Sequence, residues 1–539
     1  MLAAGNRDRW LVPVAIFAAS VLVKALGALL ISQPGYMDAY YYYHVAANLA
    51  AGRGFVEDVL WNYLDNPAGL PHPSNLYWLP LTSALIAPAL VVFGASFRSA
   101  QVSVILLSSF LPVISYFTAL SFGLSRFRAI AVASLTIFSG VYFIYWAVPD
   151  VLACFGVAGA LALYCTARGM EAGRRWFLAA AACAGLAHLA RPDGVLLLGV
   201  LLVMVLASLW WPAARETGTG SGARGSLAAG GVLLRGLGWA ASVVLVYLLV
   251  LAPWLYRNWQ AIGAVWPSSL EVLFQREYND IFRYGRTLDL AYYLDWGWQN
   301  ILGSKIHAAG ENLLVFAEPF TFYLLPFGLI GFWQLRRDRR AWPYLLYCVT
   351  LYLAMTLLFT FAGPRGSYLH SMAALLPFFF VASVNGLATA VHWVAGRLRH
   401  WVETRAQRNF LLIAVGIAAV MSGVLSVRSA LTWDDRYHAY EELAAWFAAN
   451  APSHTRVMVV DPPGWFYSSG KSAIVVASED LDTNLVVCRR YGASYLLLEA
   501  AHPLALHDLY LGKQDSPSLA LRDTVAGVRI YQVLPAEAR

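Results

Sequence analysis

Long apolar runs alternate with short polar connections along most of the chain. A helix of about 20 residues, rising 1.5 Å per residue, crosses the roughly 30 Å apolar core of a bilayer. Runs near this length occupy residues 11–31, 101–122, 129–147, 151–167, 176–190, 194–211, 237–254, 312–333, 341–361, 371–391 and 409–427. The pattern therefore predicts an all-α polytopic membrane domain with about 11 transmembrane helices.

The connections between the runs carry arginine unevenly, and this predicts the orientation. Arginine gathers in Leu124–Arg128, Arg168–Arg175, Arg336–Arg340 and the stretch 392–408. All four connections are cytoplasmic if the N-terminus is cytoplasmic, as the positive-inside rule requires. The apolar stretch Leu79–Gly94 is not counted as a span, because counting it would place several arginine-rich connections outside. We expect it to form a half-membrane or interfacial helix.

This topology leaves two large outer segments and an outer C-terminal region. The outer loops are residues 32–78 and 255–310 of a membrane domain that covers residues 1–430. From about Thr432 the pattern becomes that of a soluble α/β domain, which we assign to residues 431–539. Helical spacing predicts a helix over Tyr437–Asn450. Alternating apolar residues predict four strands, namely Arg456–Val460, Ala473–Val476, Ser494–Glu499 and Val528–Val533.

Composition removes several classes of function. With 59% hydrophobic and 13% charged residues, the chain is neither an ordinary soluble protein nor a disordered one. The net charge of +7 lies largely in short connections, so no basic stripe remains for a nucleic acid. The five cysteines include no CxxC pair, which gives no support to a zinc site or a disulfide framework. Walker, Rossmann and nucleophile-elbow motifs are also missing from the sequence.

Candidate chemistry begins in the first outer loop, where Asp38 is followed by the tyrosine run Tyr40–Tyr43. An ionisable residue just beyond a span and among aromatic residues is costly to desolvate unless it has a partner or a task. The tyrosines alone also fit an aromatic belt at the membrane interface.

Further motifs extend this pattern into a family resemblance. After Asp38 and its tyrosines, the chain carries Asn48–Phe55, His72-Pro73, Tyr77–Pro80, Pro149–Leu152, Arg191–Gly194 and Pro253–Asn258. Together they resemble the GT-C glycosyltransferases, and above all the bacterial branch similar to protein O-mannosyltransferases and the lipid A aminoarabinose transferase. The resemblance implies transfer of a sugar from a polyprenyl-phosphate carrier to an extracytoplasmic lipid, glycan or protein acceptor, with inversion. It also implies a multi-pass protein of the plasma or inner membrane whose active site and C-terminal domain are extracytoplasmic.

The same resemblance assigns roles to two carboxylates. Asp38 takes the place of the catalytic base, and Asp150 that of a second carboxylate that orients the acceptor or the sugar hydroxyls. A departing phosphate also needs cationic donors, and one guanidinium group can bind two phosphate oxygens through two parallel N–H···O bonds. The expected donors are Arg257 and Arg365 at span ends, followed by Arg191 and His370. The alternative to phosphate binding is that the arginines reach lipid headgroups and that His370 is a packed histidine at the membrane interface.

The remaining candidates are expected to line the substrate cavity, and they are Tyr41, Tyr42, His72, Tyr77 and Glu318. For His72, between two prolines, a structural role in the loop is the alternative, and Glu318 can instead cap a helix with Pro319. We expect Glu57 and Asp58 to be solvated loop acids.

Three further questions stay open at this level. Oligosaccharyltransferases share the GT-C fold and use a divalent ion, but Asp150 has no second acid beside it. We therefore expect no cofactor and no metal ligands, with a divalent metal as the alternative. Rival functions are oligosaccharyltransferase-like transfer of a preassembled glycan and a transporter or flippase for a lipid-linked sugar. Transport is disfavoured because the spans carry few charges, Lys24 being an exception, and no repeat is visible.

Overall fold

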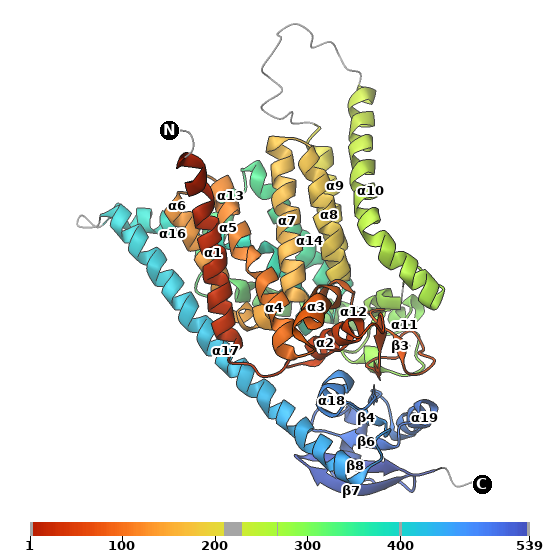
Figure 1. The fold of residues 1–539 in the computed structure, drawn as a ribbon. Helices are drawn as coiled ribbons and strands as arrows, with labels where there is room; N and C mark the ends of the chain where they lie inside the picture. Colours follow the sequence, from red (N-terminus) through yellow and green to blue (C-terminus); the bar gives the residue numbers. More distant parts are fainter. Residues whose placement is uncertain (1–3, 210–228, 267, 398–401, 536–539) are drawn as a thin grey trace.

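The computed structural model describes residues 4–209, 229–266, 268–397 and 402–535. The ends of the predicted span 194–211 and part of the connection 392–408 lie outside these ranges. Most of the described chain is helical, and the C-terminal part carries a small sheet (Figure 1).

Within the described residues, seven helical segments are long and apolar enough to cross a membrane. They fall in α1 (Ala4–Ala28), α4 (Phe97–Ser108) with α5 (Phe110–Ser121), α7 (Val151–Ala172), α10 (Ala229–Ile262), α14 (Trp342–Leu353), α15 (Tyr368–Met372) with α16 (Leu376–Ala395), and α17 (Glu403–Asn450). Two bent pairs raise the number to nine, and α8 (Arg175–Ala190) and α9 (Val195–Ala207) are shorter apolar helices. Each predicted run coincides with one of these elements, so the predicted fold class is confirmed.

The two bent spans meet at their breaks. One joins α6 (Arg126–Ile137) to the short turns of residues 140–147 at 57°, and the other joins α12 (Trp298–Ala317) to α13 (Leu325–Leu335) at 93°. Gly140 has φ +62°, and a Cβ there would lie 2.7 Å from the Thr321 hydroxyl oxygen. Thr321 itself is left-handed at φ 50°, directly after the turn that contains Pro319. The close approach therefore requires glycine at position 140.

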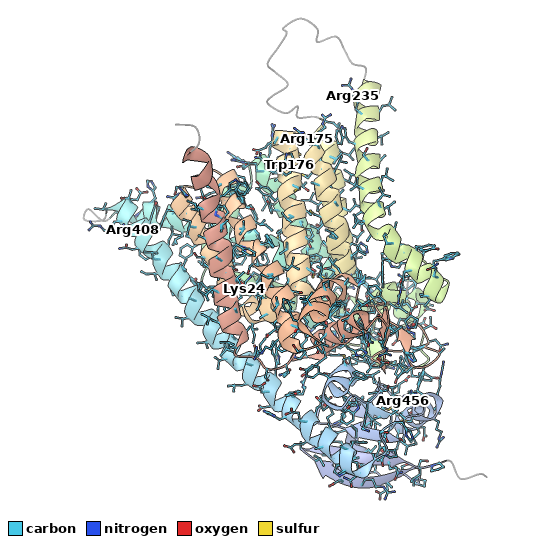
Figure 2. All side chains as sticks on the ribbon, viewed as in Figure 1. Lys24, Arg175, Trp176, Arg235, Arg408 and Arg456 are labelled. Atoms are coloured by element: carbon cyan, nitrogen blue, oxygen red, sulfur yellow. The ribbon has the colours of Figure 1, made fainter. Side chains whose placement is uncertain are left out.

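The two ends of the helical bundle differ in charge. Figure 2 shows Arg175, Arg235 and Arg408 at the end far from the C-terminal domain, in which Arg456 lies. The opposite end, which we call the loop end, carries α2 (Met37–Ala50), α3 (Leu81–Phe93) and α11 (Leu290–Leu294) (Figure 1). Arg175 and the neighbourhood of Arg408 belong to the connections on which the predicted orientation is based.

Helix α3 corresponds to the stretch that the sequence excludes from the spans. Its 13 residues are about 20 Å long, the same length as α9, so length alone does not separate it from the shorter spans. It lies beside α2 at the loop end (Figure 1). Its assignment as a half-membrane or interfacial helix therefore stays a prediction.

The C-terminal sheet contains all four predicted strands, observed as β4 (Val457–Val459), β5 (Ala473–Val475), β6 (Tyr495–Leu498) and β8 (Val528–Val533). The sequence did not predict β7 (Leu519–Val525), α18 (Pro462–Ser469) or α19 (Leu481–Tyr491). The predicted helix 437–450 is the end of α17, which continues unbroken from the last span. The domain boundary at residue 430 stays a prediction, because it falls inside this helix.

A strand from the first outer segment completes the sheet. The strand order is β2-β5-β4-β6-β8-β7, and β2 is Val59–Leu60. Val59 pairs with Ala473 and Leu60 with Ile474, in parallel. Next to it, β1 (Val56–Glu57) pairs with β3 (His72–Pro73) in a separate two-stranded sheet. The C-terminal domain is thus joined to the first outer segment by main-chain hydrogen bonds.

Side chains of the C-terminal domain also hold the second outer segment. The Arg490 guanidinium donates to the Tyr284 hydroxyl at 2.5 Å and to the Asn66 side chain at 2.8 Å. The Tyr491 hydroxyl donates to the Pro67 carbonyl at 2.9 Å. One helix end, in α19, therefore contacts both outer segments.

Candidate active site

Asp150 begins α7 and is almost fully buried. Its Oδ1 accepts the Val151 backbone N–H at 2.5 Å, which satisfies one of the N–H groups left unpaired at the start of the helix. Its Oδ2 accepts the Tyr36 hydroxyl at 2.5 Å and lies 3.0 Å from His370 Nε2. Both carboxylate oxygens are therefore already engaged by protein groups.

His370 lies in α15, just after a kinked segment in which Gly366 has φ 111°. Its Nδ1 lies 2.6 Å from the Gly366 carbonyl oxygen, and its Nε2 faces the Asp150 carboxylate. Because both ring nitrogens face acceptors, the ring must donate from both, which is the arrangement of an imidazolium. Burial alone would raise the pKa of Asp150, but His370 and the hydrogen bonds from Tyr36 and Val151 hold it below its ordinary value. The two residues form an ion pair.

Asp38 lies in the first turn of α2 and is partly buried. Among the described residues, none donates a hydrogen bond to its carboxylate. Burial and the nearby negative charge of Asp150 raise its pKa to about 6, against the opposing charges of His370, Arg191 and Arg365. Asp38 is thus a free carboxylate within electrostatic reach of the Asp150–His370 pair.

Arg191 follows α8 and reaches this group through Asp193. Its Nε donates to Asp193 Oδ1 at 3.1 Å, and the hydroxyl of Ser371 donates to the other oxygen of Asp193. Ser371 is the neighbour of His370, so the Arg191 and His370 segments are fixed to each other. Only 15% of the Arg191 side chain is exposed.

Arg365 approaches from the segment that precedes α15. Its Nη1 donates to the Tyr278 carbonyl at 2.6 Å. Its guanidinium lies 4.1 Å from the Tyr278 ring centre and 5.2 Å from that of Phe282. The second outer segment therefore positions Arg365, and the backbone N–H of Ser478 in the C-terminal domain donates to the Phe282 carbonyl at 3.1 Å.

Two of the predicted cavity tyrosines belong to the same group. Buried Tyr42 lies within electrostatic reach of Asp150, Asp38 and Arg191. Tyr77 is similarly close to Arg365, Arg191 and Asp38. Segments that are far apart in sequence thus converge around one free carboxylate, which we call the Asp38 cluster: Asp38, Tyr42, Tyr77, Asp150, Arg191, Arg365 and His370.

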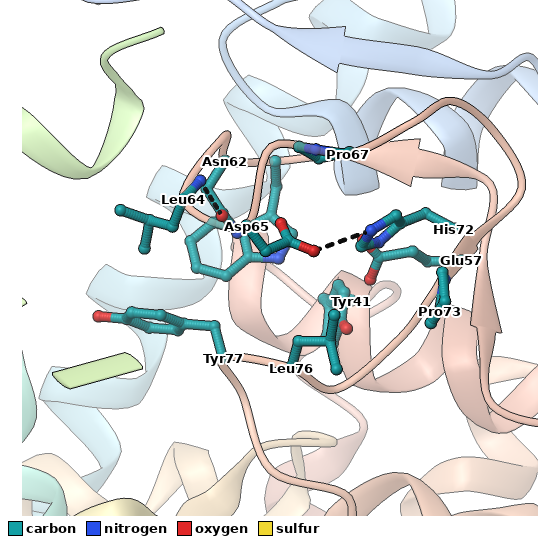
Figure 3. A pocket seen from close by; sticks show the side chains of 11 residues that line it. Tyr41, Glu57, Asn62, Leu64, Asp65, Pro67, His72, Pro73, Leu76 and Tyr77 are labelled. Carbon is teal, nitrogen blue, oxygen red and sulfur yellow. Dashed lines mark hydrogen bonds and ion pairs between the residues drawn. The ribbon is translucent and has the colours of Figure 1, made fainter. Parts of the chain in front are cut away.

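Other predicted residues occupy different places. Arg257 lies over Trp254, 4.7 Å from the ring centre, and donates to the Phe55 carbonyl at 2.6 Å. Glu318 lies at the break between α12 and α13, within electrostatic reach of Tyr145. Tyr41 and His72 line a separate pocket of the first outer segment, which Tyr77 also borders (Figure 3).

Glu57 and Asp58 were expected to be solvated, and this expectation was wrong. Glu57 is only 5% exposed, and its Oε1 lies 3.4 Å from His72 Nδ1. Asp58 accepts Arg53 at 2.6 Å and lies 3.3 Å from His44. Glu57 is thus paired with His72 and Asp58 with Arg53, and neither partner lies at a regular spacing in the sequence.

Sequence reasoning missed two residues that organise the Asp38 cluster, namely Tyr36 and Asp193. The Arg191-Pro192-Asp193 spacing was a usable signal, because the side chains pair two positions apart. Tyr36 gave no comparable signal, since its partner Asp150 is 114 positions away. Among the residues that the structure describes, no group of three or more His, Cys, Asp and Glu side chains is arranged to hold a metal ion.

Solved structures with a similar arrangement cover nearly the whole chain. ArnT from Cupriavidus metallidurans, bound to undecaprenyl phosphate, superimposes with a TM-score of 0.58 at 15% identity, over 96% of this chain and 97% of that one. The oligosaccharyltransferase AglB from Archaeoglobus fulgidus, in complex with an inhibitory peptide and a dolichol-phosphate, gives a TM-score of 0.53 at 11% identity. That alignment covers 93% of this chain and 71% of AglB. The chain has the GT-C fold.

The GT-C fold confirms the architecture that the sequence motifs implied. With its apolar helices, it identifies a multi-pass membrane protein with a C-terminal α/β domain. No family model and no curated protein matches the sequence. At these identities the likeness to ArnT and AglB concerns the fold alone.

Proposed function

We propose that the protein is a GT-C glycosyltransferase that moves a sugar from a polyprenyl-phosphate carrier to an extracytoplasmic acceptor, with inversion. The observation that carries the proposal is the Asp38 cluster at the loop end. It combines a free carboxylate, an Asp150–His370 ion pair and the guanidinium groups of Arg191 and Arg365. A base and a set of cationic donors are what this transfer requires.

In the proposed reaction, the oxygen of the acceptor hydroxyl attacks C1 of the sugar, and Asp38 accepts the proton of that hydroxyl. The bond between C1 and the phosphate oxygen breaks, and the polyprenyl phosphate leaves with the electron pair. Arg191 and Arg365 stabilise the negative charge that grows on this phosphate. With a pKa of about 6, Asp38 is mostly ionised at neutral pH and so is ready to take the proton.

Asp150 is poorly suited to be the base, because its oxygens already accept Tyr36, Val151 and His370. Its proposed role is to hold His370 in position and to raise the pKa of Asp38 through its negative charge. Tyr77, which is only partly buried, is the proposed contact of the sugar beside the reacting carbon, while the buried Tyr42 supports Asp38 and Asp150 from within.

A lipid-linked donor is supported by two observations. The cationic residues lie at the loop end of a membrane-spanning bundle, where a lipid phosphate is located. The similar ArnT and AglB structures contain undecaprenyl phosphate and dolichol-phosphate, respectively. We place the loop end on the extracytoplasmic side of the cell membrane, since the arginine-rich connections are at the opposite end (Figure 2).

The likeness to AglB favours a second candidate, which is transfer of a preassembled glycan to a protein. One assay separates the two functions. Purified protein in lipid nanodiscs is given either radiolabelled polyprenyl-phosphate monosaccharides or a radiolabelled lipid-linked oligosaccharide, with membrane extract as the acceptor source, with and without a chelator. Turnover of one monosaccharide donor that resists the chelator is the expected result. Turnover of lipid-linked oligosaccharide alone, abolished by the chelator, would favour the second candidate.

A further inference from the structure

Helix α17 carries the last span and continues unbroken to Asn450 in the C-terminal domain (Figure 1). Two of its residues, Trp433 and Asp434, contact the segment 32–36 between α1 and α2. That segment ends at Tyr36, whose hydroxyl donates to the Asp150 carboxylate at 2.5 Å. Neither Trp433 nor Asp434 takes part in the proposed chemistry, yet both act on a residue that touches the site.

Three aromatic rings fix the side chain of Tyr36. Its ring centre lies 5.5 Å from that of Trp433 and 5.7 Å from that of Tyr145. Trp433 and Tyr145 are themselves 5.7 Å apart, and all three pairs are tilted or edge to face. Aromatic rings attract each other in such orientations at separations of about 4.5–7 Å. Trp433 and Tyr145 therefore hold the Tyr36 ring between them.

The backbone before Tyr36 allows Trp433 to come this close. Gly35 has φ +102°, a conformation that other residues rarely adopt. A Cβ on Gly35 would lie 2.5 Å from two carbons of the Trp433 ring, far inside van der Waals contact. Both the conformation and the contact therefore require glycine at position 35.

Asp434 holds the same segment by hydrogen bonds. Its Oδ1 accepts the Ser32 hydroxyl at 3.3 Å and the Gln33 amide N–H at 3.4 Å. The amide oxygen of the buried Gln33 accepts the Tyr40 hydroxyl of α2 at 2.6 Å. These bonds join α17 to the first turns of α2, where Asp38 lies.

The hydroxyl of Tyr36 acts on the charge of the site. Burial and the negative charge of Asp150 hold the pKa of Tyr36 well above its ordinary value, so the hydroxyl keeps its proton and donates it. Burial raises the pKa of Asp150, but His370 and the bond from Tyr36 more than offset this. An ionised Asp150 is the partner that the His370 cation needs. Moving the Tyr36 hydroxyl away would therefore disturb the Asp150–His370 pair.

We propose that Trp433 is a positioning residue of the active site, which fixes the Tyr36 ring so that its hydroxyl donates to Asp150. The active site is thereby tied to the point where the last span continues into the C-terminal domain. The part that Trp433 plays in catalysis rests on the proposed function, whereas its hold on Tyr36 does not.

A double-variant cycle on stability tests the hold itself, with the full chain in nanodiscs. Tyr36→Phe removes only the hydroxyl, and Trp433→Leu removes the ring that fixes it. Tyr36→Phe should lower the melting temperature of the natural protein but change it little in the Trp433→Leu background, because the hydroxyl is no longer held on Asp150 there. Equal losses in the two backgrounds would overturn the proposal.

Trp446→Leu is the matched control on the same helix. Trp446 packs on Phe447 and Tyr495 of the C-terminal domain, so its loss should also destabilise the protein. In this background Tyr36→Phe should lower the melting temperature as much as it does in the natural protein. A reduced effect of Tyr36→Phe in this background as well would show a general loss of stability and overturn the proposal.

Sugar transfer tests the role in catalysis. Trp433→Leu and Tyr36→Phe should each lower kcat about tenfold, the effect of losing one hydrogen bond to a charged group, with the KM of the donor unchanged. The double variant should be no slower than the slower single variant. Trp433→Phe, which keeps a ring, should recover most of the rate, and Trp446→Leu should keep the natural kcat. Losses that multiply in the double variant would overturn the positioning role.

A second substitution keeps both cycles decisive if Trp433→Leu does not fold. Gly35→Ala displaces the same ring through its added Cβ and takes the place of Trp433→Leu. Coupling between Trp433 and the Tyr36 hydroxyl in a protein that transfers no sugar would refute the proposed function but not the hold. Sugar transfer by a protein without this coupling would refute the inference and leave the proposed function standing.

Discussion

His370 Nε2 lies 3.0 Å from Asp150 Oδ2, although 220 positions separate the two residues in sequence. Their opposite charges act on Asp38 in opposite directions, and the negative charge of Asp150 has the larger effect. Burial is the largest cause of the raised pKa of Asp38, and the ion pair adjusts this pKa further.

The first prediction concerns the pH dependence of transfer. A base must be ionised to act, and the pKa of Asp38 is raised to about 6. We expect kcat/KM to rise about tenfold per pH unit below pH 6 and to level off above it. Initial rates between pH 4.5 and 8 measure this. A rate that stays flat down to pH 4.5 would show that the base is an unshifted carboxylate or another group.

Variants of the ion pair should move this profile in opposite directions. Asp150→Asn removes the negative charge that raises the pKa of Asp38, so the midpoint should fall below 6. His370→Gln removes a charge that lowers this pKa, so the midpoint should rise above 6. Both variants are expected to transfer sugar more slowly, so the test relies on the pH at the midpoint of the kcat/KM profile and not on the rate itself. Shifts in the same direction would contradict the arrangement.

Arginine variants test the phosphate site. Arg365→Ala or Arg191→Ala should each raise the KM of the lipid-linked donor about 10- to 100-fold, because a charge-assisted hydrogen bond contributes about 1.5–3 kcal/mol. Arg257→Ala is the matched comparison and should have the smaller effect, since Arg191 and Arg365 act on Asp38 whereas Arg257 lies beside Phe55 and Trp254. Equal effects of Arg257→Ala and Arg365→Ala would place the phosphate nearer α10.

Removing a single hydroxyl group tests the contact between the C-terminal domain and the first outer segment. Tyr491→Phe removes the hydroxyl that donates to the Pro67 carbonyl at 2.9 Å in a buried position. We expect a loss of about 1 kcal/mol in stability, seen as a lower melting temperature in detergent. Tyr510→Phe should change little, because its hydroxyl makes an exposed bond of 3.3 Å to Gly527. An unchanged melting temperature for Tyr491→Phe would show that this contact is not stabilising.

The sequence predicted those parts of the fold that depend on local pattern. Apolar runs were enough for the spans and for four strands of the C-terminal sheet. The strand β2 could not be predicted, because two residues that pair with Ala473 and Ile474 have no pattern of their own. The continuous α17 was also missed, since its polar half reads as a separate helix.

The site follows the same division. Asp38 stands out in the sequence because an acid among tyrosines next to a span is unusual. Asp150 stands out because it directly precedes the span 151–167. Their relation to His370 and Arg191 is set by how α7, α8 and α15 pack, which no spacing in the sequence records. For the same reason the pocket around His72 could not be recognised, since its acids come from two turns of an irregular loop.

The most direct test of the account is sugar transfer by Asp38→Asn in nanodiscs, with the donor that the natural protein uses. Asparagine keeps the size of the side chain but cannot take a proton, so kcat should fall at least about 100-fold while the melting temperature and donor binding are kept. Asp482→Asn, on an exposed acid of α19, serves as the control and should transfer at the natural rate. Undiminished transfer by Asp38→Asn would contradict the assignment of the base and, with it, the central claim about this site.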